Sequence, residues 1–236
     1  MSEYTYVGQE LDLFAHAINW KAYFHARLAK YVRGDVLEIG AGIGGTTRTL
    51  CDGDQSSWVC AEPDAEMASR LAQVAQEEPF PVTPEVLVGG LADLDPERRF
   101  DAILYIDVLE HIEDDRGELE MARRFLKPGG NLVVLSPAFQ FLFSPFDAAV
   151  GHHRRYTARS LTAVMPSGLE RVRVFYLDSV GMLTSLLNRF VLKQGTPDIK
   201  QIQLWDRVIV RVSRFVDPVV LHSFGRSVIA VYGMPS

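Results

Sequence analysis

A glycine-rich turn near the start of the chain has the composition of a cofactor-binding loop. The turn, Gly40-Ala41-Gly42-Ile43-Gly44-Gly45, follows the strand-like run Val36-Leu37-Glu38-Ile39 and precedes a predicted helix. Glycine allows the backbone to approach a ligand closely. Glu62 ends the next predicted strand, at about the 20-residue offset where an acid can accept hydrogen bonds from both hydroxyls of a ribose. The turn and Glu62 together indicate a site for an adenosine-containing cofactor.

The charges around this turn distinguish between two classes of cofactor. The glycines also fit the G-x-G-x-x-G pattern of NAD-binding proteins. However, Glu38 precedes the turn inside an apolar strand, and Asp107 ends another predicted strand. An unpaired buried carboxylate is costly, which favours a functional role for Glu38. Carboxylates repel a pyrophosphate and attract a cofactor that carries sulfonium and ammonium groups, so the pattern disfavours NAD.

Five motifs from about Asn19 to Thr157 resemble those of the class I S-adenosylmethionine-dependent methyltransferases of the small-molecule type. In family order they are V-L-E-I-G-A-G-I-G at 36–44, A-E-P-D at 61–64, G-G-L-A-D-L at 89–94, F-D-A-I-L-Y-I-D-V-L-E-H-I at 100–112 and F-L-K-P-G-G at 125–130. One position departs from the family pattern, because Gly90 stands where many relatives carry a polar residue.

The resemblance implies S-adenosylmethionine as the cofactor and a place for each motif around it. Glu38 and the glycines are implied to hold the methionine part, Glu62 the ribose diol, Leu91-Ala92 the adenine, and Ile106-Asp107 the sulfonium end. Trp20 joins the set because the predicted helix before the sheet is expected to cap the cleft. The residues expected to bind the cofactor are Trp20, Glu38, Gly40, Gly42, Glu62, Pro63, Leu91, Ala92, Ile106 and Asp107.

Three histidines follow predicted strands at the expected cofactor edge, and each is a candidate general base. His152 and His153 follow the fifth predicted strand, and His111 follows the fourth. Imidazole titrates near neutral pH and can take a proton from a hydroxyl acceptor. For His111 a structural role is favoured, in which it orders the turn together with Glu110. We expect no metal site, because His152 and His153 find no convincing further ligands among Cys51, Cys60 and the other histidines.

The segment at 136–157 combines aromatic and cationic side chains, as an acceptor pocket would require. Aromatic residues form pocket walls, and arginine can orient a carboxylate or phosphate. The predicted acceptor-binding residues are Phe139, Phe143, Arg154, Arg155 and Tyr156. A structural alternative stays open, in which His152 and Arg155 pair with Asp147 to hold the loop and Thr157 caps a helix at 158–164.

Short apolar runs alternate with helical patterns, which predicts an α/β protein with a mostly parallel sheet and helices on both faces. The predicted strands cover 36–39, 58–61, 86–88, 102–106, 131–136, 170–177 and 227–232, and the predicted helices 44–51, 65–76 and 115–126. Pro128-Gly129-Gly130 is expected to end the third of these helices. The resemblance implies a Rossmann-like class I methyltransferase fold with seven strands, the seventh antiparallel between the fifth and sixth.

We expect a single domain over residues 1–236 with two additions. The first is an amphipathic cap helix at about 10–33, with Phe14, Ile18 and Tyr23 on its apolar side. The second is a helical insertion between the last two strands, at about 179–226. Within it, one apolar stripe contains Trp205, Val208, Ile209, Val212 and Phe215. We expect this stripe to cover the cleft and line the acceptor pocket, with a homodimer interface or a peripheral membrane-contacting face as alternatives.

The charge balance of the 236 residues is acidic, with 24 Lys+Arg against 30 Asp+Glu and a net charge of -6. This balance disfavours a nucleic-acid partner. Neither a secretory signal nor a run of about 18 apolar residues is visible, so we expect a cytoplasmic protein without a transmembrane segment. The predicted function is methyl transfer to a small-molecule or lipid-like acceptor, preferably on oxygen. The alternatives are a non-catalytic cofactor-binding or interaction protein on the same fold, and less favourably an NAD-dependent oxidoreductase.

Overall fold

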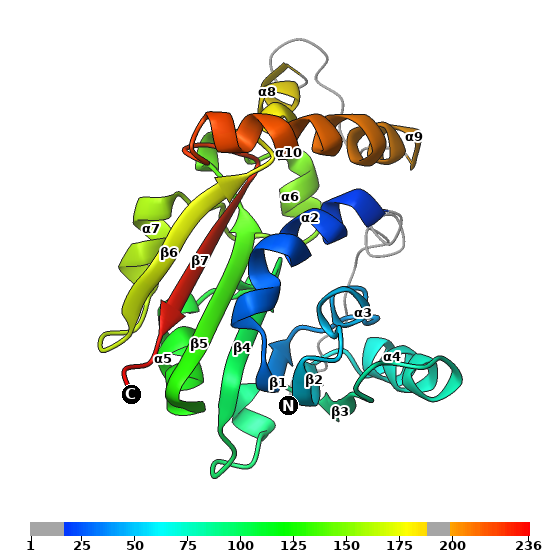
Figure 1. Cartoon of the computed structure of the whole chain (residues 1–236), viewed down its shortest axis with the longest axis vertical. Helices are drawn as coiled ribbons and strands as arrows, with labels where there is room; N and C mark the ends of the chain where they lie inside the picture. The colour runs from blue at the N-terminus through cyan, green and yellow to red at the C-terminus, as the bar shows by residue number, and fades with distance from the viewer. Residues whose placement is uncertain (1–16, 188–198) are drawn as a thin grey trace.

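Seven strands form one sheet in the order β3-β2-β1-β4-β5-β7-β6 (Figure 1). The computed structural model describes residues 17–187 and 199–236. In chain order the strands are β1 (Gly34–Ile39), β2 (Gln55–Glu62), β3 (Glu85–Val88), β4 (Phe100–Ile106), β5 (Leu126–Pro137), β6 (Glu170–Leu177) and β7 (Ser227–Gly233). β7 is antiparallel to β5 and β6, and all other neighbours are parallel. The predicted seven-stranded Rossmann-like fold is confirmed.

Helices cover both faces of the sheet. One core packs α2 (Ile18–Leu28), α3 (Thr47–Leu50) and α4 (Ala65–Glu77) against the sheet, and the other packs α5 (Asp115–Arg124) and α7 (Ala158–Val164) on the opposite face. Short helical turns, η1 (Ala29–Tyr31), η2 (Leu91–Asp93), η3 (Leu109–His111) and η4 (Gln140–Leu142), connect these elements. The central strands β1 and β4 are buried on both faces, which is why their sequences read as almost continuous apolar runs.

The predicted helix at 44–51 is shorter in the structure and forms only the single turn α3, Thr47–Leu50. Gly44 has a φ of 82°, in the left-handed region that a right-handed helix cannot include. The glycine turn therefore extends further along the chain than predicted, and α3 begins after it.

The prediction that Pro128-Gly129-Gly130 ends a helix before the next strand is wrong. α5 ends at Arg124, and β5 already begins at Leu126, so the Pro-Gly-Gly sequence lies inside the strand. Leu126 pairs with Phe100 and Asn131 with Ala102, which leaves the residues between them out of the ladder. Proline is tolerated at such an irregularity because no ladder hydrogen bond is lost there.

The cap helix α2 spans Ile18–Leu28, within the predicted range of about 10–33, and continues into η1. Phe14 and the other residues before 17 lie outside the described part. Ile18 was expected on the apolar side, but it is 71% exposed, whereas Trp20, Tyr23 and Phe24 are buried. The inward face is therefore rotated relative to the prediction.

The insertion between β6 and β7 lies over the carboxyl edge of the parallel strands, the edge at which α6 (Pro145–Ala149) also follows β5 (Figure 1). Its described parts are α8 (Ser179–Leu187) and one long helix made of α9 (Ile199–Leu204), the π-helical turn η6 (Trp205–Ile209) and α10 (Val210–Val219). Residues 188–198 lie outside the described part. No helix within 17–187 or 199–236 is long and apolar enough to cross a membrane.

The apolar stripe predicted along the long helix is divided in the structure. Trp205 is buried, whereas Val208, Val212 and Phe215 are exposed. The π-helical turn causes this change, because the Val210 N–H donates to the Trp205 carbonyl five residues earlier. The wider turn brings Trp205 and Val210 to the buried side. Ile209 is partly buried against the core, and Val208, Val212 and Phe215 stay outside.

Candidate active site

A cavity of about 250 Å³ opens at the carboxyl edge of the sheet. It is lined by segments that lie far apart in the sequence: the start of α2, the glycine turn, the residues after β4, the segment after β5, the long helix of the insertion and the start of β7. The lining residues most relevant to function are Trp20, Gly40, Gly42, Ile106, Asp107, His111, His152, Arg155, Trp205 and Arg226. Ligands of open α/β folds bind at this edge.

The glycine turn forms one wall with its backbone. Gly40, Gly42 and Gly44 have φ values of 64°, 55° and 82°, in the region that favours glycine. A Cβ on Gly40 would also lie 2.7 Å from Cγ2 of Val108. Gly40 is therefore required by both its conformation and the space around it.

Glu62 fixes this turn to the end of β2. Its Oε2 accepts a hydrogen bond from the Gly42 N–H at 2.7 Å, and its Oε1 accepts one from the Asp64 N–H at 2.9 Å. Burial raises the pKa of Glu62 above its ordinary value, although both backbone hydrogen bonds lower it. A carboxylate can accept about four hydrogen bonds, so Glu62 keeps acceptor capacity for a ligand.

The residues expected around the adenosine lie beside the cavity. Glu62 and Pro63 close β2, and Leu91 and Ala92 begin η2 after β3. Because β2 adjoins β1 and β3 adjoins β2 in the sheet, these residues continue the same edge beyond the glycine turn. None of the four lines the 250 Å³ cavity itself.

Glu38 lies beneath the glycine turn and does not line the cavity. Its Oε2 accepts hydrogen bonds from Oγ1 of Thr47 at 2.7 Å and Nε1 of Trp58 at 3.0 Å. Burial raises its pKa to about 7, although these hydrogen bonds lower it. In this arrangement the carboxyl group connects β1 with α3 and β2.

Asp107 brings an acidic group to the cavity. It follows β4 with a φ of 54°, lines the cavity beside Ile106 and is exposed there. Desolvation of the carboxyl group by the cavity walls raises the pKa of Asp107 to about 6, although the positive charges of His152, Arg226 and Arg155 lower it. The group is therefore mostly ionised at neutral pH and favours a cationic ligand.

His152 is oriented by a buried carboxylate. Its Nδ1 lies 2.9 Å from Oδ1 of Asp147. Arg155 donates two hydrogen bonds to the same carboxylate, from Nε to Oδ1 at 2.8 Å and from Nη2 to Oδ2 at 2.9 Å. Burial raises the pKa of Asp147, but the hydrogen bonds from His152 and Arg155 outweigh it and hold the pKa well below its usual range. Because a carboxylate only accepts, we assign the proton to Nδ1 of His152, which leaves Nε2 with a lone pair.

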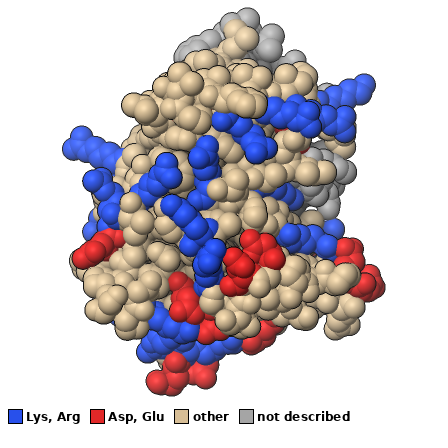
Figure 2. Space-filling view, in the orientation of Figure 1, with Lys and Arg blue, Asp and Glu red and all other residues tan. Residues whose placement is uncertain are grey.

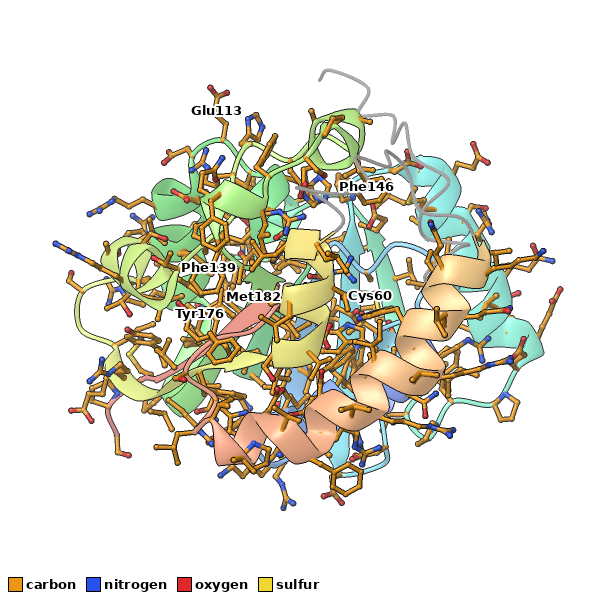
Figure 3. The ribbon with its side chains drawn as sticks, turned by 90° about the horizontal axis from the view of Figure 1, so that it is seen from above. Cys60, Glu113, Phe139, Phe146, Tyr176 and Met182 are labelled. Carbon is orange, nitrogen blue, oxygen red and sulfur yellow. The ribbon has the colours of Figure 1, made fainter. Side chains whose placement is uncertain are left out.

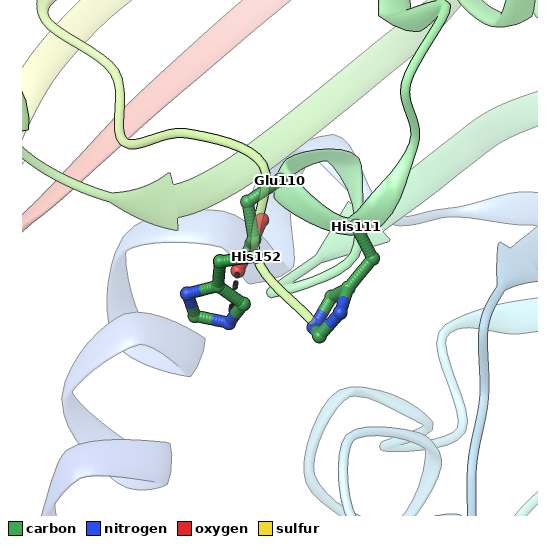
Figure 4. A group of neighbouring side chains, drawn as sticks. All are labelled: Glu110, His111 and His152. Atoms are coloured by element: carbon green, nitrogen blue, oxygen red, sulfur yellow. Dashed lines mark ion pairs between the residues drawn. The ribbon is translucent and has the colours of Figure 1, made fainter. Parts of the chain in front are cut away.

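Glu110, His111 and His152 form a cluster at this wall (Figure 4). Glu110 is fully buried, and within the described residues neither of its carboxyl oxygens has a hydrogen bond of normal geometry. Its Oε1 lies 4.0 Å from Nε2 of His152. Burial, followed by the Asp107 charge, raises the pKa of Glu110 well above its usual value.

The second imidazole of this cluster is held neutral. Burial, with His152 and His153 nearby, lowers the pKa of His111 to about 4. The rings of His111 and His152 meet edge to face with centroids 4.6 Å apart. One nitrogen or oxygen atom from each of Glu110, His111 and His152 could serve as a metal ligand, and these three atoms lie within 4.8 Å of one another. The prediction that there is no metal site considered only cysteine and histidine as further metal ligands beside His152, and it did not include the carboxylate of Glu110.

Arg154 and Tyr156 bind Asp115 instead of lining the cavity. Nη1 of Arg154 and the hydroxyl of Tyr156 each donate to Oδ2 of Asp115 at 2.7 Å. Thr157 caps α7 by accepting from the Ser160 N–H. The contacts of the structural alternative are therefore present, including the pairing of His152 and Arg155 with Asp147. The same two residues also line the cavity, so these contacts are compatible with a functional role.

The aromatic residues of this loop are divided between two environments. Phe139 stacks on Tyr176, with ring centroids 5.0 Å apart, and Figure 3 shows this pair away from Phe146. Neither Phe139 nor Phe143 lines the cavity, but Phe146 does. His153 is exposed and also does not line it.

Sequence reasoning missed Arg226, a cation in the cavity wall. Its guanidinium carbon lies 4.8 Å from the ring centroid of Trp205, which also lines the cavity. Burial lowers the pKa of Arg226, although Asp178 raises it. The signal was present, because Arg226 directly precedes β7 and an antiparallel strand begins at the edge where its parallel neighbours end.

The roof of the cavity is attached through buried aspartates that were also missed. Asp206 accepts hydrogen bonds from the backbone N–H of Asn19 at 3.1 Å and of Trp20 at 2.8 Å. Nε1 of Trp205 donates to Asp178 at 2.7 Å. The Asp206 contacts join the cap helix to the insertion, and the Asp178 contact holds Trp205 to the end of β6. Trp20 and Trp205 both line the cavity.

Comparison with known proteins was consistent with this arrangement. Residues 37–132 match the family model described as a methyltransferase domain. A demethylmenaquinone methyltransferase of Tropheryma whipplei (strain Twist) is 32% identical over 124 residues, which are 51% of this chain and 49% of that protein. The chain thus spans about half the length of the curated relatives that it matches first.

Solved structures resemble the whole chain in fold. The N-methyltransferase NodS from Bradyrhizobium japonicum WM9 in complex with S-adenosyl-L-homocysteine is 14% identical, with a TM-score of 0.58 over 93% of this chain and 88% of NodS. A putative methyltransferase of Haloferax volcanii, solved with its Trm112 activator, is 18% identical, with a TM-score of 0.63 over 97% and 95%. The [4+2]-cyclase SpnF is 16% identical, with a TM-score of 0.63 over 97% and 96%. At these identities the likeness shows the fold.

Proposed function

We propose that this chain, whose residues 37–132 match the methyltransferase-domain family, is a class I methyltransferase that transfers a methyl group from S-adenosylmethionine to a small-molecule acceptor. The observation that carries the proposal is the cavity that the glycine turn, Asp107 and His152 line together. It combines a cofactor-binding wall with a candidate base. The relative named demethylmenaquinone methyltransferase supports a small-molecule acceptor.

The cofactor would lie along the edge formed by β4, β1 and β2. The backbone of the glycine turn can approach its methionine part, and the remaining acceptor positions of Glu62 suit the two ribose hydroxyls. The carboxylate of Asp107 would stabilise the cationic end. S-adenosylmethionine supplies an electrophilic methyl group, so the protein's main task is to align the acceptor and exclude water.

His152 is the best candidate for a general base, which an oxygen acceptor requires. Asp147 holds its Nδ1, and Nε2 remains available to take the acceptor's proton. His111 is a weaker base because its pKa is only about 4. His153 is exposed outside the cavity, which makes it the less favoured member of the pair.

The side chains that line the rest of the cavity indicate the chemical character of the acceptor. Phe146 and Trp205 provide apolar walls, and Arg155 and Arg226 provide positive charge. We therefore propose an acceptor with an apolar body and an acidic hydroxyl or other electron-rich oxygen. Arginine near such an oxygen stabilises the anion that forms as His152 removes the proton.

Calorimetry tests the cofactor assignment. We expect S-adenosylhomocysteine to bind and NAD not to bind. Glu62→Gln should weaken binding about 10- to 100-fold, since one of the charge-assisted hydrogen bonds to the ribose is replaced by a poorer contact. Glu66→Gln, on an exposed glutamate of α4, is the matched control. Unchanged affinity in folded Glu62→Gln protein would contradict the assignment.

A methyl-transfer assay over a panel of phenols, enols and amines tests the reaction. His152→Ala should lower turnover about 10²- to 10⁴-fold with an oxygen acceptor, and His153→Ala should change it only a few-fold. Comparable losses in both variants would contradict the choice of His152. Cofactor binding without turnover on any acceptor would favour a protein that binds the cofactor without methyl transfer, since the same fold also carries other activities.

A further inference from the structure

The outer surface of the insertion holds most of the large apolar side chains that this protein exposes. Nine of the thirteen such residues in the described parts belong to residues 179–221, and two of them, Leu183 and Leu187, lie on α8. Large exposed apolar patches mark interaction sites on folded proteins. The insertion therefore has a second surface, separate from the side that roofs the cavity.

These side chains form a regular stripe along the long helix. The residues of the stripe are Leu204, Val208, Val212, Phe215 and Val219, spaced by four, four, three and four residues. All five are exposed in the structure, although the first interval crosses the π-helical turn. On α10 the spacing of Val212, Phe215 and Val219 places them along one side of the helix. Phe215 and Val219 are 80% and 81% exposed, so the stripe is fully accessible at its carboxyl end.

The charges beside the stripe all have the same sign. Lys200, Arg207, Arg211 and Arg214 are exposed on the long helix, and its acidic residues, Asp206 and Asp217, are buried in internal hydrogen bonds. In Figure 2 basic side chains lie at the upper right of the molecule, beside α9 and α10, as well as further down, whereas most acidic ones lie in the lower half. The local positive charge contrasts with the net charge of -6 for the whole chain.

We propose that this face docks on the surface of an anionic phospholipid bilayer, with the helix of α9 and α10 lying in the plane of the headgroups. An apolar stripe bordered by lysine and arginine is the composition of helices that lie in this interface. Anionic lipids attract each nearby cation, and the apolar side chains enter the boundary of the acyl chains. A second copy of the chain fits less well, because a symmetric pair would bring two sets of arginines together.

Docking in this way would place the cavity next to the bilayer. Trp205 lies on the same helix as the stripe and lines the cavity from the other side. Asp206 ties this helix to the start of α2, so the roof is anchored to the cap helix at the cofactor side. An apolar acceptor dissolved in the bilayer would then have a short path to the site. This last step rests on the proposed function, whereas docking itself does not.

Vesicle co-sedimentation tests the proposal with the full chain. We expect sedimentation with vesicles of phosphatidylcholine and phosphatidylglycerol, little with phosphatidylcholine alone, and loss of binding in high salt. Phe215→Ser with Val219→Ser should lower the bound fraction at least about tenfold. Lys200→Glu with Arg207→Glu should lower it about 25-fold or more, at roughly fivefold per neutralised cation. Arg207 is chosen because Arg211 and Arg214 contact Asn19 and Tyr23.

Two exposed residues away from the insertion provide matched controls. Val172→Ser on β6 and Arg159→Glu on α7 change the same kinds of side chain and should leave vesicle binding unchanged. Equal binding to neutral and anionic vesicles, or equal loss in the control variants, would overturn the proposal. So would a stable dimer in light scattering that Phe215→Ser with Val219→Ser dissociates, because the stripe would then bind a second copy.

The same variants separate this proposal from the proposed function. Their affinity for S-adenosylhomocysteine, measured by calorimetry without vesicles, should equal that of the parent protein. A parent protein that binds anionic vesicles but no S-adenosylhomocysteine would support docking and contradict the methyltransferase proposal. The reverse result would leave the methyltransferase proposal intact and overturn docking.

Discussion

Replacing Glu38 by glutamine should make the protein more stable at alkaline pH. Glu38 is 2% exposed, and burial raises its pKa from 4.5 to about 7. Below pH 4.5 the carboxyl group is protonated in both the folded and the unfolded chain, so it causes no pH dependence. Between pH 4.5 and 7 the unfolded chain loses this proton first, and stability falls as the pH rises. Above pH 7 the accumulated loss from this group reaches about 3 kcal/mol.

The structure indicates that glutamine can replace this side chain with little other cost. The hydrogen bonds from Thr47, Trp58 and the Cys60 thiol are all accepted by the same oxygen, Oε2. A glutamine can place its carbonyl oxygen there and its amide group at the position of Oε1. We therefore expect Glu38→Gln to differ from the parent by less than about 1 kcal/mol at pH 4.5 and to be more stable by about 3 kcal/mol at pH 8.

Urea unfolding of the cofactor-free protein at pH 4.5 and pH 8 measures this difference. Glu97→Gln, on an exposed glutamate, is the control and should show no such gain. The reasoning would be refuted if Glu38→Gln and the parent lost stability in parallel between these two pH values. That result would mean that the pKa of Glu38 is not raised in the folded state. The folded protein would then stabilise the ionised carboxylate about as well as water does.

Three further changes test other parts of the site. Asp206→Ala should lower the free energy of unfolding by about 2–4 kcal/mol in urea titrations, because the N–H groups of Asn19 and Trp20 lose their acceptor. Asp147→Asn should reduce turnover about 10²- to 10⁴-fold with unchanged affinity for S-adenosylhomocysteine in calorimetry, because His152 loses the carboxylate that fixes its tautomer. Gly40→Ala should cost about 1–3 kcal/mol in thermal unfolding, since alanine is strained at a φ of 64°, and should weaken the same ligand.

The sheet and the cofactor-side loop could be predicted because local sequence determines them. β1 and β4 are central strands buried on both faces, and burial of this kind requires continuous apolar residues that are recognisable in one sequence. The glycine turn is similarly local, since its positive φ values restrict the residue type. The exact start of α3 was not predictable from periodicity, because the conformation of Gly44 decides it.

The acceptor side could not be predicted in the same way, because its contacts join residues that are distant in sequence. Arg154 and Arg155 are adjacent, yet Arg154 binds Asp115 and Arg155 binds Asp147 beside the cavity. Composition alone cannot distinguish them. The long helix was misjudged for another reason, since a π-helical turn changes which residues share a side, and sequence periodicity assumes a uniform helix.

Buried carboxylates explain how such distant segments can form one rigid roof. A helix begins with backbone N–H groups that have no partner within the helix, and a carboxylate from another element can satisfy several of them. Asp206 does this for α2, and Asp217 accepts from the N–H of Asp178 and Ser179 at the start of α8 and from the hydroxyl of Tyr23 on α2. Apolar contacts alone would permit sliding, whereas these directional bonds fix the position of each helix. Trp20 and Trp205 therefore keep their places at the cavity even though no strand of the sheet carries either one.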